Sequence, residues 1–239
     1  MVPEISIVVP VFNERNSIAT LVREIVAALE RHVFFEIIYV DDHSTDDTLS
    51  KLLTMRSMVS QLRVITHGQR CGQSTAIRSG VLAARAPWVA TLDGDGQNDP
   101  VDIIKLLGRR VAAHQNVKLF AGWRVARQDS SSKRWASRFA NTIRSWLLHD
   151  GAPDTGCGIK LFERAAFLTL PYFDHMHRFL PAMFQRAGWD VESVPVSHRQ
   201  RYSGVSKYDN LRRAWVGVPD LLGVAWLIRR SKRPSVQEL

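Results

Sequence analysis

The chain has 239 residues, of which 45% are hydrophobic and 23% are charged, and its formal net charge at pH 7 is +9. This composition is typical of a globular protein, and it excludes a disordered chain, a collagen and a coiled coil as descriptions of the whole. The two cysteines, Cys71 and Cys157, are too few for a disulfide framework or a four-thiolate zinc site, and their scarcity fits a reducing compartment.

The first hundred residues alternate between short apolar runs and helical patterns. The apolar runs, each too short for a helix and typical of a buried strand, span residues 5–11, 35–40, 62–65 and 87–92. One helix is expected from an N-cap at Asn16 or Ser17 to about His32, and another near residues 74–84, after Gly72. Repeated strand–helix units predict an α/β fold with a mostly parallel, twisted sheet and helices on both faces.

The second half of the chain is less regular. We expect strands at residues 117–121 and 188–196, and a helix at 133–149 in which basic and aromatic residues interleave. The sequence contains no internal repeat and no low-complexity linker. It therefore predicts one α/β domain over residues 1–210, followed by a tail at residues 211–239.

Polar side chains follow three of the predicted strands. The three strings are Pro10–Glu14, Asp41–Asp46 and Asp93–Pro100. Ligands bind parallel sheets at the carboxyl ends of the strands, and acidic groups gathered there repel one another unless a cation compensates them. Asp93 and Asp95, with the amide oxygen of Gln97, offer the oxygen ligands that Mg²⁺ prefers when substrate phosphate completes its shell.

Each string also has a purely structural interpretation. The run Asp41–Asp46 could be a turn with a helix N-cap, and the run Asp93–Pro100 could be a loop that leads to proline at a helix start. A calcium-binding loop is excluded, because Asn98 stands where that loop requires glycine and Ile104 where it requires glutamate. The coincidence of three strings at one sheet edge favours a functional site.

The sequence resembles the nucleotide-sugar glycosyltransferases of family 2, in the branch of dolichol-phosphate mannose synthase and its bacterial polyprenyl-phosphate relatives. The resemblance covers about residues 4–210 and is carried by the three strings above, together with Gly72, Ala76 and Gly80. The string at residues 93–100 is close to diagnostic of this branch. The implied fold is the Rossmann-like GT-A arrangement, in agreement with the sheet predicted above.

The resemblance also implies roles for the donor side of the site. The residues that would line the nucleotide pocket are Pro10, Phe12, Asn13 and Glu14. The residues that would reach the base and ribose are Asp41 and Asp42. Asp93 and Asp95 would be the DxD pair, which binds Mg²⁺ or Mn²⁺ together with the donor diphosphate, and Gln97 would be a further metal ligand.

Basic residues of the second half would serve the acceptor and the leaving group. Four residues are expected near the acceptor phosphate: Arg124, Lys133, Arg134 and Ser137. The last three would share one face of a helix. In a loop that closes over the donor in this family, Arg201 and Lys207 would offset leaving-group charge. Asp154 is expected to position other groups, since a phosphate acceptor is already an anion and needs no strong base.

Two basic blocks suggest an anionic partner. Residues 105–145 carry ten basic and one acidic side chain, and residues 199–233 carry nine and two. The tail is apolar from Trp215 to Ile228 except for Asp220, is interrupted by Pro219, and ends in basic residues. It is too short to span a bilayer but suited to lie on an anionic membrane; a helix docked on the domain is the alternative.

The chain start has no secretory signal pattern, so we expect a cytoplasmic protein that is peripheral on the cytoplasmic face of a membrane. A small membrane protein is a possible partner. His175 and His177 are only two histidines, and such a pair is more often structural than a metal site, so we expect them to be structural.

Together these features predict a metal-dependent, inverting glycosyltransferase. It would move mannose from GDP-mannose, or next glucose, onto a dolichyl or undecaprenyl phosphate. The family's polymer synthases carry Gln-x-x-Arg-Trp, and its absence here argues against polymer synthesis. One alternative is transfer to a non-lipid hydroxyl. Another is a non-enzymatic nucleic-acid-binding protein; it leaves the acidic strings unexplained, so we expect no nucleic-acid partner.

Overall fold

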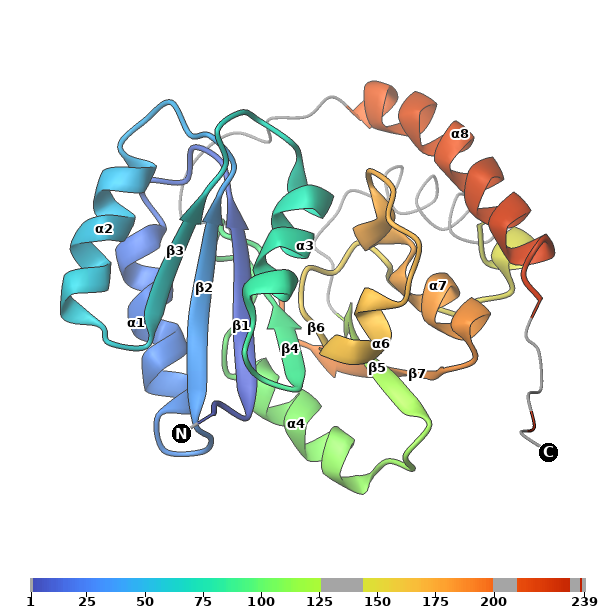
Figure 1. Ribbon diagram of the computed structural model, residues 1–239, viewed down its shortest axis with the longest axis horizontal. Coiled ribbons are helices and arrows are strands. Elements are labelled where there is room, and N and C mark those ends of the chain that lie inside the picture. Colours follow the sequence, from blue (N-terminus) through green and yellow to red (C-terminus); the bar gives the residue numbers. More distant parts are fainter. Residues whose placement is uncertain (1, 126–143, 200–209, 233–236, 238–239) are drawn as a thin grey trace.

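A single mixed sheet organises the chain (Figure 1). The computed structural model describes residues 2–125, 144–199, 210–232 and 237, with only the backbone described at 210–216. The described strands are β1 (Ile5–Val11), β2 (Phe35–Asp41), β3 (Leu62–Thr66), β4 (Trp88–Thr91), β5 (Val117–Arg124), β6 (Lys160–Glu163) and β7 (Asp190–Val196). Their spatial order is β3-β2-β1-β4-β6-β5-β7, and β6 alone among them runs antiparallel to its neighbours.

Helices cover both faces of this sheet (Figure 1). The described helices are α1 (Ile18–Leu29), α2 (Thr48–Met58), α3 (Gln73–Ala83), α4 (Asp102–Ala112), α6 (Arg164–Leu168), the 3₁₀ turn η1 (Met176–Arg178), α7 (Leu180–Ala187) and α8 (Asn210–Arg229). The alternation of side chains along each strand divides the core into two layers. Ile7 and Val9 pack with α1, α2 and α4, whereas Val8 packs with α3, α6, α7 and α8.

The strands expected from the sequence are confirmed, as are the parallel pairings of the first half. The first helix begins after Ser17, but the Ser17 hydroxyl does not cap it. Its Oγ instead lies 2.8 Å from the carbonyl oxygen of Glu14 and 2.5 Å from that of Gly94. Ser17 therefore ties the loop after β1 to the loop after β4.

The second half differs from the expectation at two points. Strand β6 was not predicted, because it has only four residues and continues directly into α6. Pro219 does not interrupt the tail: α8 runs through it. Proline removes one backbone hydrogen bond, while Val224 and Ala225 of the following turns are buried in the core layer that contains α7.

The part of the tail up to Arg229 is thus a helix placed against the domain. Of the helix expected at 133–149, residues 144–148 are helical and the earlier part lies outside the described residues. Within the described ranges, no helix has both the length and the apolar character needed to cross a membrane.

Candidate active site

A cavity of about 710 Å³ lies at the carboxyl ends of β1, β2 and β4. This is the sheet edge predicted from the sequence, and the volume suits a small organic ligand. Predicted site residues that line it are Pro10, Phe12, Glu14, Asp42, Asp93, Asp95, Gln97 and Arg124. The cavity therefore joins the predicted donor residues to one predicted acceptor residue.

Two carboxylates crowd one wall of the cavity. Asp95 is buried, and its Oδ1 accepts a hydrogen bond from the backbone amide of Gln97 at 3.0 Å. Asp93 Oδ1 accepts one from Gln73 Nε2 at 3.0 Å. Burial, and then the charge of Asp95, raise the pKa of Asp93 to about 6, although Lys160 and Arg124 act in the opposite direction. The crowding is a cost that a bound cation would relieve.

The donor set fits a hard divalent cation. Two carboxylates and the amide side chain of Gln97 border the same cavity, and oxygen ligands of this kind suit Mg²⁺ or Mn²⁺. The loop that carries them is held internally, since the Asp93 amide donates to Asn98 Oδ1 at 3.2 Å.

The loop before β6 closes tightly over Asp93. A Cβ atom added at Gly158 would lie 2.1 Å from Asp93 Oδ2, so only glycine fits there without a shift. Thr91 Oγ1 donates to the Gly158 carbonyl at 2.7 Å, and Lys160 Nζ donates to the Cys157 carbonyl. These contacts fix the position of Asp93 from outside its own loop.

Lys160 is a cavity residue to which the sequence analysis assigned no role. It is 4% exposed, begins β6, and faces Thr91 of β4 across the antiparallel pairing. Burial lowers the pKa of its ammonium group, while the charges of Cys157, Asp93 and Asp154 act to raise it. Its sequence signal was its place six residues after Asp154.

Arg124 and Asp154 form a two-pronged ion pair in the same wall. Arg124 Nε lies 2.7 Å from Asp154 Oδ2, and the Arg124 Nη2 lies 2.9 Å from Oδ1. Such a fork fixes the plane of a guanidinium group. Asp154 therefore holds the Arg124 side chain in place, and its positioning role in the site stays a prediction.

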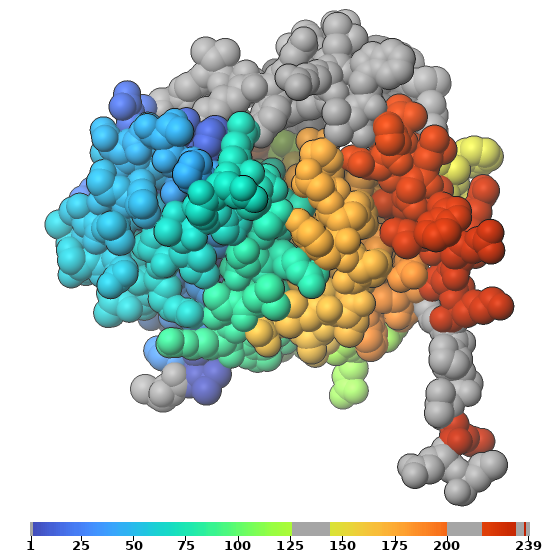
Figure 2. Space-filling model, turned by 45° about the horizontal axis from the view of Figure 1, so that its top comes forward, coloured from blue at the N-terminus to red at the C-terminus, as the bar shows by residue number. Residues whose placement is uncertain are grey.

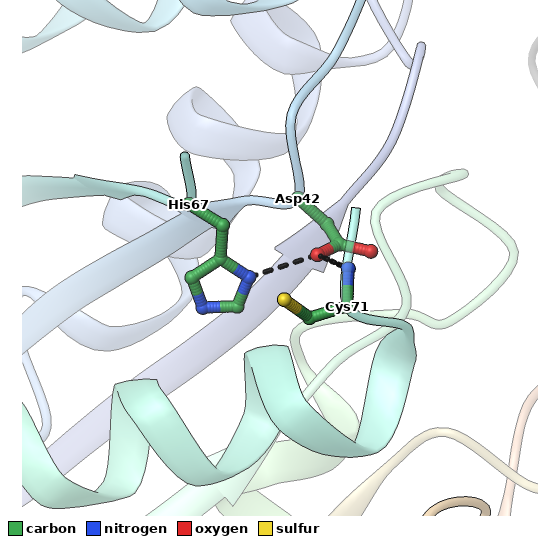
Figure 3. A group of neighbouring side chains, drawn as sticks. All are labelled: Asp42, His67 and Cys71. Atoms are coloured by element: carbon green, nitrogen blue, oxygen red, sulfur yellow. Dashed lines mark hydrogen bonds and ion pairs between the residues drawn. The ribbon is translucent and has the colours of Figure 1, made fainter. Parts of the chain in front are cut away.

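Asp42 anchors the start of α3 (Figure 3). Its Oδ1 accepts from the Cys71 amide and from His67 Nδ1, both at 2.8 Å, and its Oδ2 accepts from the Gly72 amide at 2.8 Å. Gly72 has φ +89°, a left-handed conformation that glycine tolerates, at the point where the chain turns into α3.

Asp42, His67 and Cys71 also place potential metal ligands within 4.8 Å of one another. Both oxygens of Asp42 already accept hydrogen bonds from the protein, and Mg²⁺ and Mn²⁺ do not favour a thiol ligand. Asp42, His67 and Cys71 therefore form a hydrogen-bond network beside the cavity, which Asp42 lines.

Some of the remaining residues predicted to bind the nucleotide line the cavity, and others support its loops. The Arg70 guanidinium lies 4.0 Å from the centre of the Phe12 ring, and both residues line the cavity. Asn13 instead bonds Thr45, which joins two loops. Asp41 is buried at the end of β2, where its Oδ1 has no hydrogen-bond partner among the described residues.

Other predicted and unpredicted residues complete the picture. The predicted residues that lie outside the described part of the chain are Lys133, Arg134, Ser137, Arg201 and Lys207. His177 lines the cavity, with its Nδ1 2.7 Å from Ser74 Oγ; burial lowers its pKa well below the ordinary value, so the ring is neutral at pH 7. The cavity is also lined by Gln73, Arg70 and Arg178, which belong to no motif recognised in the sequence.

Comparison with known proteins gives a family match and several relatives. Residues 6–170 match the family described as glycosyl transferase family 2. The chain is 34% identical over 250 residues to the dodecaprenyl-phosphate galacturonate synthase of Rhizobium johnstonii, covering 97% of this chain and 69% of the relative. It is 31% identical over 213 residues to the undecaprenyl-phosphate 4-deoxy-4-formamido-L-arabinose transferase of Sodalis glossinidius, covering 88% of this chain but 64% of that relative. The curated relatives are thus longer than this chain.

Solved structures share the fold. The chain is similar to the glucosyl-3-phosphoglycerate synthase of Mycobacterium tuberculosis, solved with Mg²⁺ and UDP, with a TM-score of 0.70 and 20% identity over 98% of this chain and 81% of that one. The same enzyme was also solved with Mn²⁺, UDP-glucose and glycerol 3-phosphate, at a TM-score of 0.69. This likeness, together with the mostly parallel sheet, confirms the expected GT-A fold.

Proposed function

The chain belongs to glycosyl transferase family 2, and from that premise we propose that it transfers a sugar from a nucleotide-sugar to a polyprenyl phosphate, with inversion at the anomeric carbon. One observation carries the proposal: a single cavity is lined by the carboxylates of Asp93 and Asp95 and by the cations of Arg124 and Lys160. The acidic groups fit a metal–diphosphate, and the basic groups fit a phosphate acceptor. The names of the two relatives above, both polyprenyl-phosphate enzymes, support the same acceptor class.

On the donor side, Asp93, Asp95 and Gln97 would hold Mg²⁺ or Mn²⁺, which when bound supplies charge neutralisation for the departing diphosphate. Pro10, Phe12 and Glu14 would line the nucleotide pocket, as they line the cavity. Asn13 remains proposed for the nucleotide pocket, and Asp41 and Asp42 for the base and ribose. The contacts above favour a supporting role for Asn13 and Asp42.

On the acceptor side, Arg124 would bind the lipid phosphate, with its plane fixed by Asp154. A phosphate oxygen then attacks the anomeric carbon, the bond from that carbon to the diphosphate oxygen breaks, and the nucleoside diphosphate leaves. The attacking group is already anionic at neutral pH, so no side chain need remove a proton from it. Lys133, Arg134, Ser137, Arg201 and Lys207 stay proposed as further phosphate and leaving-group contacts.

The sugar is proposed at two levels. A nucleotide-activated sugar follows from the family, whereas mannose, with glucose next, is the expectation from the sequence alone. The relatives are named for galacturonate and 4-deoxy-4-formamido-L-arabinose, and for dodecaprenyl and undecaprenyl carriers. These names widen the donor panel and favour the undecaprenyl class over dolichyl phosphate as the acceptor.

A transfer assay tests the proposal. Purified protein would be incubated with undecaprenyl phosphate in detergent, Mg²⁺ or Mn²⁺, and labelled GDP- and UDP-sugars that include uronate and amino-sugar donors. We expect label in the organic phase, and no label when EDTA is present. Label on a soluble glycan or protein hydroxyl instead of lipid would overturn the acceptor assignment and support the alternative enzyme class.

A membrane-facing surface on α8 extends this proposal. Val218, Leu222 and Trp226 recur every fourth residue and are 54–59% exposed, so they form one apolar stripe along the helix. The helix lies along the outside of the domain (Figure 2), where Val224 and Ala225 are buried in the core. Arg229, Arg230 and Lys232 follow the stripe.

We propose that this stripe docks on an anionic membrane, with residues 1–210 as the catalytic domain and 211–239 as the docking tail. The cytoplasmic face, and a small membrane-protein partner, remain predictions. Sedimentation with vesicles containing phosphatidylglycerol should recover the protein, and Trp226→Ser with Leu222→Ser should reduce recovery about tenfold or more. Equal recovery of Leu82→Ser, an exposed leucine on α3, would be the matched control.

A further inference from the structure

The segment that follows β7 is bonded to the loop that carries the proposed metal ligands. The Ser197 amide donates to Asp102 Oδ2 at 2.7 Å, and the Arg199 amide donates to the carbonyl oxygen of Gln97 at 3.0 Å. The Arg199 guanidinium continues this connection: its Nη2 lies 2.5 Å from Asp99 Oδ2. Two residues distant in sequence thus hold the loop over residues 93–102 from outside.

The same guanidinium reaches a third element. Arg199 Nη1 lies 3.1 and 3.2 Å from the two carboxylate oxygens of Glu24, in the middle of α1. Because α1 packs in the core, Glu24 gives the arginine a fixed support. We name these three residues, Glu24, Asp99 and Arg199, together with the Gln97 carbonyl, the Arg199 clasp.

The clasp acts on a loop that needs an external restraint. Asp93 and Asp95 are crowded carboxylates, and Asp99 adds a third acidic group within seven residues, whereas Asp102 is paired with Lys105. Mutual repulsion favours opening of such a loop, while a planar guanidinium that bonds two carboxylates opposes it. The backbone amide of Arg199 donates to the carbonyl oxygen of Gln97, the residue whose side chain is the third proposed ligand.

We propose that Arg199 is a positioning residue that sets the affinity of the site for its divalent cation by holding Gln97 and Asp99 in place. This inference rests on the proposed function, since it takes Asp93, Asp95 and Gln97 as the metal ligands. Outer partners of metal ligands commonly change metal affinity by about 10- to 100-fold when they are replaced. Arg199 itself does not contact the cation or the reacting atoms.

The test measures metal binding directly. The Mn²⁺ dissociation constant of the full chain would be measured in the presence of UDP by electron paramagnetic resonance of free Mn²⁺, for wild type, Arg199→Met, Arg199→Lys and Arg109→Met. Arg109 is the matched control: it forms a 2.5 Å ion pair with Glu192 on the outer surface, away from the loop. We expect about 10-fold or greater weakening for Arg199→Met, partial recovery for Arg199→Lys, and no change for Arg109→Met.

The outcomes separate the clasp from the function beneath it. Unchanged Mn²⁺ affinity in a folded Arg199→Met would overturn the clasp and leave the proposed function intact. Wild type that binds no Mn²⁺ with UDP, and none with GDP in a parallel titration, would overturn both. If Arg199→Met does not fold by circular dichroism, Asp99→Asn decides: it keeps the acceptor oxygen that binds the Val101 amide but weakens the pair with Arg199, and we expect about threefold weaker Mn²⁺ binding. Unchanged binding in Asp99→Asn would then overturn the proposal.

Discussion

The two halves of the sheet reach the same cavity by opposite routes. In the first half, β1, β2 and β4 run parallel, so the loops after their carboxyl ends meet at one edge and bring Asp42, Asp93 and Asp95 together. In the second half, β6 is reversed between β4 and β5. Its first residue, Lys160, therefore lies at that same edge, while Arg124 arrives at the end of β5.

This difference separates the chemistry of the two walls. The parallel half supplies acidic groups in loops, where glycine-rich turns can adapt to a cation. The half that contains β6 supplies cations from strand ends, with their positions fixed by an ion pair or by backbone carbonyls. Changes in the first half should therefore abolish chemistry, and changes in the second should shift affinity or position.

The largest effect is expected from the acidic wall. Asp95→Asn removes a charge that no other described residue replaces, and transfer should fall by about 10³-fold or more, together with loss of Mn²⁺ binding. Initial rates of lipid-linked product formation measure the effect. Asp190→Asn, at the exposed start of β7, is the control. A transfer rate near wild type in Asp95→Asn would show that the acidic wall does not carry the metal.

A smaller effect should follow from the contact between the two walls. Gly158→Ala would place a methyl group 2.1 Å from Asp93 Oδ2, so Asp93 or the loop must move. Displacement of a reacting constellation by about 1 Å costs on the order of 10²-fold in rate, and we expect kcat to fall by about 10- to 100-fold.

Gly108→Ala is the matched control, because an added Cβ there meets nothing within 4 Å in α4. It should leave the transfer rate unchanged and stabilise the fold by about 0.5 to 1 kcal/mol. If both alanine variants transfer sugar at the wild-type rate, close packing of Gly158 on Asp93 has no part in catalysis.

Breaking the fork of the basic wall should change affinity more than rate. Arg124→Lys keeps the charge but loses the paired contacts with Asp154, so the KM for polyprenyl phosphate should rise about tenfold while the KM for the donor stays near wild type. Steady-state kinetics with each substrate varied in turn distinguish the two constants. A change confined to the donor KM would assign Arg124 to the other half of the reaction.

The smallest effect is on stability. The folded-state pKa of Asp93 is raised to about 6 from an ordinary 3.8, mainly by burial and then by Asp95, so its ionised form destabilises the metal-free fold above pH 6. Asp93→Asn should therefore stabilise the protein in EDTA by about 1 to 2 kcal/mol at pH 7.5, or about 3 to 6 °C in Tm, and not at all below pH 4.

Thermal unfolding at the two pH values measures this difference. Asp47→Asn, whose carboxylate is 70% exposed, serves as the control and should show no comparable gain. A lower Tm for Asp93→Asn at pH 7.5 would mean that the carboxylate stabilises its loop even without a cation.

The donor side of the site could be predicted from sequence because its signals are local. Asp93, Asp95 and Gln97 lie within five residues, after an apolar run that reads as a strand, and the rule for parallel sheets places the loop. The acceptor side was harder: Arg124 and Asp154 are thirty residues apart, and the role of Lys160 depends on the reversal of β6. When a strand is inserted antiparallel, its first residue lies at the edge where the parallel strands end. A strand of four residues shows too short a pattern for this reversal to be inferred from the sequence.

The sequence by itself determined the family, the alternation of strands and helices, and the acidic string, because each depends on residues that are neighbours along the chain. Only the tertiary structure decided which cations face Asp93, which glycine must pack on it, and which arginine holds its loop. Those pairings join residues that are 31 to 102 positions apart and that long-range packing alone brings into contact, so their geometry follows from the whole fold and not from any local pattern.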